Sequence, residues 1–93
     1  MARITRRFAG RKDAEIFDKV HEVMEKIAEE FKLDYRQNES LRSGEVSKMG
    51  IKGTFAVKSG EVVVEMKYPM LIPGSMRAKV EDHIERKLDA LFV

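Results

Sequence analysis

The sequence contains no cysteine and only two prolines among its 93 residues. The lack of cysteine excludes disulfide bonds and metal sites built on thiolates. Long hydrophobic runs are also missing: Val62–Val64 and Pro69–Pro73 are far shorter than the ~20 apolar residues that cross a membrane. The first twelve residues hold no acidic side chain, and no apolar stretch follows them, so we expect no secretory signal. These absences favour a cytoplasmic protein with no membrane span.

The composition that remains is that of a folded globule. Hydrophobic residues make up 43% of the chain and charged residues 37%, and the length suits a single α+β domain over residues 1–93. The formal net charge is only +2, but it is unevenly distributed. Residues 1–12 form a basic segment with five Arg or Lys side chains, whereas the rest of the chain is slightly acidic.

Two segments have the hydrophobic spacing of amphipathic helices, about 13–31 and 75–92. A helix buries residues at steps of three and four, which form one apolar face. The first segment places Phe17, Val20, Met24, Ile27 and Phe31 at such steps, and the second does so with Met76, Val80, Ile84, Leu88, Leu91 and Phe92.

Strand patterns lie between the two helices. Residues 51–58 and 61–68 alternate apolar and polar side chains and are separated only by Ser59-Gly60, which predicts a β-hairpin. Residues 4–8, 33–37 and 41–49 have weaker strand signals. Gly44 is interpreted as a bend or bulge, and Gly53 as a bulge or a close backbone approach. The chain is therefore predicted to pack both helices on one face of a small antiparallel sheet of three to four strands.

No constellation of residues indicates catalysis, a cofactor or a metal. His21-Glu22 and Glu25 resemble a zinc-protease motif whose second histidine is replaced, and His83 is the only other histidine. A zinc site of that kind needs two histidines one helical turn apart and a third ligand. Solvated helix residues are the better interpretation, and we expect the protein not to be an enzyme.

Two surface segments are candidates for binding. The basic side chains Arg3, Arg6, Arg7, Arg11 and Lys12 are a candidate anion contact, although nucleic acid is not a favoured partner because strong binding needs six or more phosphate contacts. An apolar connection follows the hairpin, and its candidate interaction patch is Tyr68, Met70, Leu71, Ile72 and Met76. Three consecutive bulky residues between two prolines either plug the end of the core or form an exposed patch for a partner.

The order of these features resembles a known family. The residues that carry the resemblance are the strand 50–57 (Gly-Ile-Lys-Gly-Thr-Phe-Ala-Val), the strand Val62–Met66, the Leu71-Ile72-Pro73 exit and the helix from Val80 to Phe92. Together they are similar to the polyhydroxyalkanoic acid system proteins, also called the polyhydroxyalkanoate granule-region family. The resemblance implies a small bacterial accessory protein associated with storage-polyester metabolism, and it implies no catalytic residue.

Three functions from different classes follow. The first is a non-enzymatic accessory protein that associates with polyhydroxyalkanoate granules. The second is a partner-binding or small-ligand-binding module, with a homodimer formed through an edge strand as one form of it. The third is a weak nucleic-acid binder that uses the basic N-terminus.

Overall fold

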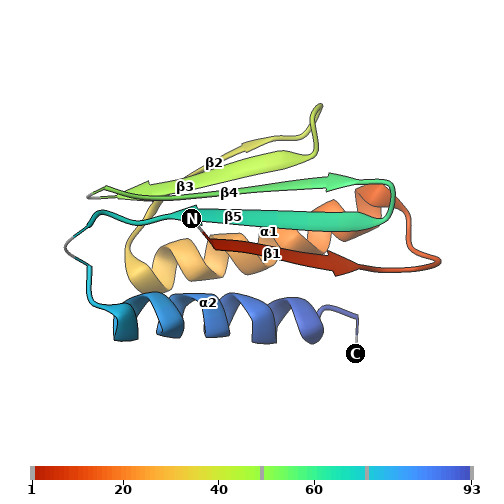
Figure 1. The fold of residues 1–93 in the computed structure, drawn as a ribbon. Coiled ribbons are helices and arrows are strands. Elements are labelled where there is room, and N and C mark those ends of the chain that lie inside the picture. Colours follow the sequence, from red (N-terminus) through yellow and green to blue (C-terminus); the bar gives the residue numbers. More distant parts are fainter. Residues whose placement is uncertain (1, 49, 71, 93) are drawn as a thin grey trace.

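The computed structural model describes residues 2–48, 50–70 and 72–92, which fold into one antiparallel sheet and two helices (Figure 1). The elements in chain order are β1 (Ala2–Arg7), α1 (Asp13–Phe31), β2 (Asp34–Asn38), β3 (Ser43–Lys48), β4 (Ile51–Lys58), β5 (Glu61–Lys67) and α2 (Gly74–Asp89). The α+β class is confirmed. Both helices lie against the same face of the sheet, and the other face has no helix over it.

The sheet has the strand order β1-β5-β4-β3-β2, and every neighbouring pair is antiparallel. Strands β2 to β5 form a meander, and the N-terminal strand β1 then pairs with β5. The hairpin of β4 and β5 is confirmed, with Ser59 and Gly60 both at positive φ in its two-residue turn. Asp13, at the start of α1, accepts hydrogen bonds from the backbone N–H groups of both turn residues, at 3.1 and 2.7 Å.

The sheet has five strands, whereas the sequence predicted three to four. The weak segments β1 and β3 both join it. Strand β3 shows little alternation because Ser43, Glu45 and Ser47 point to the uncovered face and only Val46 is buried. Gly44 was interpreted as a bend or bulge and is instead a regular ladder residue, opposite Gln37 on one side and Phe55 on the other.

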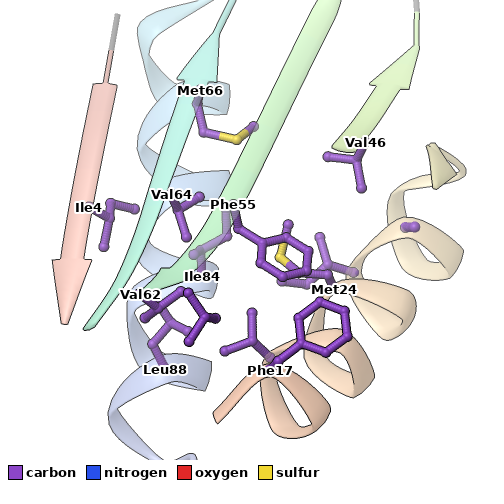
Figure 2. Close-up of a cluster of buried hydrophobic side chains, with 14 of the residues drawn as sticks. Ile4, Phe17, Met24, Val46, Phe55, Val62, Val64, Met66, Ile84 and Leu88 are labelled. Atoms are coloured by element: carbon purple, nitrogen blue, oxygen red, sulfur yellow. The ribbon is translucent and has the colours of Figure 1, made fainter. Parts of the chain in front are cut away.

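Within the described ranges, sixteen hydrophobic residues are buried in the core between the helices and the sheet, and many of them are drawn in Figure 2. Helix α1 has the predicted bounds and contributes six of them. Helix α2 contributes Val80, Ile84 and Leu88, and it ends at Asp89, earlier than predicted. Past its end, the Phe92 ring packs edge-on against Phe8 at 5.3 Å between ring centroids. Among the described residues, no polar or charged side chain is buried.

Candidate functional site

The apolar connection between β5 and α2 forms an exposed turn. The backbone N–H of Ile72 donates to the carbonyl oxygen of Pro69 at 3.2 Å, which closes a four-residue turn with Met70 in it. The Met70 side chain is 95% exposed, the highest value among the large hydrophobic residues that the structure describes as exposed. Tyr68 and Ile72 are half-buried and Met76 is 44% exposed. Leu71, the fifth residue of the predicted patch, lies outside the described residues.

The turn is tied to α2 by polar contacts on both sides of Met70. The Tyr68 hydroxyl donates a hydrogen bond to Glu81 Oε2 at 3.1 Å. Arg77 lies over the Tyr68 ring, 5.7 Å from its centroid, and its Nη2 donates to the Ile72 carbonyl oxygen at 3.4 Å. Pro69 also stiffens the turn, because its ring fixes its own φ. The contacts therefore hold the flanks of the turn down while Met70 projects into solvent.

A second connection lies against the same turn. Gly50, between β3 and β4, has φ of +88°, and a Cβ atom placed on it would be 3.3 Å from the Pro69 Cβ atom. Figure 1 shows the β3–β4 and β5–α2 connections at the same end of the sheet. The Pro69–Ile72 turn is therefore the apolar tip of a larger end surface, which we call the turn end.

Both tyrosines of the chain have a raised pKa. Burial, and then the nearby Glu25 charge, raises the pKa of Tyr35 to about 12. Burial also raises the pKa of Tyr68, with the hydrogen bond to Glu81 adding to the effect. The Tyr35 hydroxyl oxygen also lies 2.7 Å from His21 Nδ1, a contact that the sequence did not predict.

We expect neither tyrosine of the folded chain to ionise at its ordinary pKa of about 10. Because the folded pKa lies above the unfolded value, each neutral tyrosine contributes stability that is fully present below about pH 10. The contribution of Tyr35 is lost as the pH rises through about 12, and that of Tyr68 at higher pH. The chain has two tyrosines and no tryptophan, so near-ultraviolet absorbance of tyrosinate measures both directly. The chain unfolded in urea is the control and should titrate near 10. Ionisation at that pH in a chain still folded by circular dichroism would contradict the expectation.

The basic N-terminal side chains are divided between two faces of β1 and the loop after it. Arg6 points to the helix side and forms ion pairs with Asp89 at 2.7 Å and Glu85 at 3.2 Å, and the Asp89 hydrogen bond raises its pKa. Arg7 pairs with Glu61 at 3.3 Å across the ladder.

Arg11 pairs with Glu15 at 3.5 Å and also lies over the Phe92 ring. Arg3 and Lys12 are exposed, and neither forms an ion pair within the described part of the chain. The five cations are therefore not gathered into one patch, and anion binding by them stays a prediction.

The two histidines have different contact partners. His21 stacks on Phe17 with ring centroids 6.1 Å apart, and its Nε2 is 3.8 Å from Glu25. His83 Nε2 lies 3.1 Å from Glu30, so this pair joins α2 to α1. Over residues 2–48, 50–70 and 72–92, no group of three His, Asp or Glu side chains is placed to hold a metal ion.

A shallow hollow of about 770 Å³ lies on the uncovered face of the sheet. Its lining includes Arg3, Arg36, Glu45, Thr54, Val63 and Glu65, which come from all five strands. Sequence reasoning missed it because strand alternation predicts two faces but cannot tell that one of them stays without a helix. The sheet order also leaves β1 and β2 as edge strands. Homodimerisation through one of these edges stays a prediction.

Fold and surface together define a two-layer α+β protein that displays an apolar turn at one end of its sheet. A family model described as "putative polyhydroxyalkanoic acid system protein" matches residues 4–92, and the chain belongs to this family. A search of curated proteins and a search of solved structures each gave no match. None of the helices in the described ranges is long and apolar enough to cross a membrane.

Proposed function

We propose that this chain is a non-catalytic accessory protein that binds the surface of polyhydroxyalkanoate granules through the Pro69–Ile72 turn. The observation that carries the proposal is the exposure of Met70, at 95%, on a turn whose flanks are held by Tyr68 and Arg77. Membership of the polyhydroxyalkanoic acid system family supplies the polyester context.

The chemistry of the tip suits such a surface. A polyester inclusion presents an irregular apolar face, and methionine is a flexible, polarisable side chain that adapts to irregular apolar partners. Transfer of one such side chain from water stabilises a complex by roughly 1.5–3 kcal/mol. Met76, which is 44% exposed at the start of α2, adds apolar area beside it. A surface made of many identical ester groups requires no specific pocket, only a tip that reaches it.

The test is sedimentation of the pure protein with lipid-free polyhydroxyalkanoate particles. We expect the wild-type chain to sediment with the particles and Met70→Asp to bind at least tenfold more weakly, since burial of about 1.5 kcal/mol or more is lost. Leu41→Asp is the matched control, because Leu41 is 70% exposed but lies in the β2–β3 turn, at the other end of the sheet (Figure 1).

Wild-type protein that stays in the supernatant would refute the proposal, as would equal losses for the two variants. Circular dichroism and thermal unfolding check that both variants remain folded, which is expected because neither side chain is part of the core.

A further inference from the structure

Three lysines lie near the strand ends that form the turn end. Lys67 is the last residue of β5 and directly precedes Tyr68. Lys52 stands opposite Lys67 in the β4–β5 register, so two like charges are neighbours on the uncovered face. Lys48 is the last residue of β3 and flanks the connection that contains Gly50, where an added Cβ atom would meet Pro69. All three side chains belong to exposed residues, and we call them the lysine collar.

The collar is poorly neutralised by the protein itself. Like charges directly opposite one another in a ladder are unfavourable. Lys52 has a partial counterion in Glu45, at 3.7 Å with both side chains about half exposed. Within the described residues, Lys48 and Lys67 form no ion pair, unlike Arg6 and Arg7 at β1. The collar therefore places exposed ammonium groups at the end of the sheet from which Met70 projects into solvent.

We infer that the turn end docks on an anionic phospholipid surface, with Met70 among the acyl chains and the lysine collar at the level of the phosphates. This inference rests on the proposed function and names the surface chemistry that the same tip would engage. Lysine stems lie along apolar surface while their ammonium groups stay in water, and each lysine near an anionic lipid surface strengthens binding.

The shape of the turn end favours lipid over a protein partner. A stable protein interface covers roughly 800 Å² on each side, whereas the described apolar surface here is one projecting methionine with Met76 and Ile72 beside it. A convex tip of that size fits a deformable surface better than a matched pocket. The arrangement of a small apolar tip inside a cationic rim is typical of interfacial binding, in which buried apolar area and electrostatic attraction act together.

The test is co-sedimentation with lipid vesicles at two salt concentrations. One set of vesicles is phosphatidylcholine alone, and in the other about a third of the lipid is phosphatidylglycerol, which carries the negative charge that attracts basic segments. We expect binding to the acidic vesicles that weakens with salt, and little binding to the neutral ones. Lys48→Gln with Lys67→Gln should bind the acidic vesicles about 30-fold more weakly, the factor expected for two lysines.

The matched control is Lys19→Gln with Lys58→Gln, which has the same net charge. Lys58 lies six residues beyond Lys52 along β4, a separation of about 20 Å. Lys19 lies twelve residues before the end of α1 at Phe31, which is about 18 Å along the helix. Both separations exceed the Debye length of about 10 Å, so the control variant should bind the acidic vesicles as strongly as the wild type does.

Equal binding to neutral and acidic vesicles would overturn the inference, and so would equal losses for the two double variants. The lipid-free polyester particles separate this result from the proposed function. If the wild type binds those particles but no acidic vesicle, the lipid inference fails and the proposed function stands. If it binds neither, both fail. If the collar variant loses binding to the acidic vesicles but keeps its binding to the bare particles, both are supported.

Discussion

Phe55→Ala is expected to lower the free energy of unfolding by about 3–5 kcal/mol, the usual loss for removing a buried phenylalanine ring. Phe55 is 2% exposed and comes from β4, the central strand of the sheet. Its ring lies 5.9 Å from the Phe17 ring on α1 and 6.4 Å from the Tyr35 ring on β2, measured between centroids. Figure 2 shows the side chain projecting from the sheet toward α1. One deletion therefore weakens the contact of three elements.

The loss is large compared with the total stability of a small domain, about 5–15 kcal/mol. Urea unfolding followed by far-ultraviolet circular dichroism measures it. Phe92→Ala is the comparison, because Phe92 is only partly buried at the edge of the core, and its loss should be clearly smaller. A loss for Phe55→Ala no greater than that for Phe92→Ala would contradict the packing described for the centre of the sheet.

Gly44→Ala is expected to destabilise the chain by about 1–3 kcal/mol, the usual cost of adding atoms to a filled core. A Cβ atom at Gly44 would overlap ring carbons of Phe55 and would lie 3.1 Å from Tyr35 Cε1. The Phe55 ring packs against Phe17 and Tyr35, so a shift of the ring would disturb these two contacts. Gly74→Ala is the control, since no atom lies within 4 Å of its added Cβ, and it should be neutral or slightly stabilising.

A double-mutant cycle identifies the cause of that loss. If the Phe55 ring is the obstacle, Phe55→Leu should relieve part of it, and the double variant with Gly44→Ala should lose less than the sum of the single losses. Strict additivity would show that the destabilisation comes from backbone effects at Gly44 instead. The coupling energy measures the contact that brings a glycine of β3 under an aromatic ring of β4.

The packing of the core and the proposed binding by the tip are separable in these experiments. The core variants are expected to lower the free energy of unfolding. Met70 and the lysine collar are exposed and lie outside the core cluster. Binding residues on a connection need a rigid scaffold behind them. Strand β5 and helix α2 supply this scaffold, because Tyr68 directly follows β5 and its hydroxyl donates a hydrogen bond to Glu81 of α2. Variants of the tip should accordingly change binding while leaving the unfolding transition in place.

The sequence by itself determined the elements whose signals are local. Helix α1 begins and ends where its three- and four-residue spacing predicted, because an amphipathic period over nineteen residues has few alternatives. The β4–β5 hairpin follows in the same way from two alternating runs joined by Ser59-Gly60. The family membership also rests on the sequence alone, through the match over residues 4–92. Of the candidate site, the sequence identified the apolar segment after the hairpin and its confining prolines.

The tertiary structure alone decided whatever depends on partners distant in the chain. Strand β1 becomes part of the sheet by pairing with β5, and Arg6 is neutralised by Asp89, 83 positions away. Gly44 is a ladder residue because Phe55 occupies the space of its missing side chain. The projection of Met70 depends on contacts of Tyr68 and Arg77 with α2, and the lysine collar depends on the register that sets Lys52 opposite Lys67. Periodicity reports which side of an element is apolar, but only packing decides what covers that side and which residues are left outside.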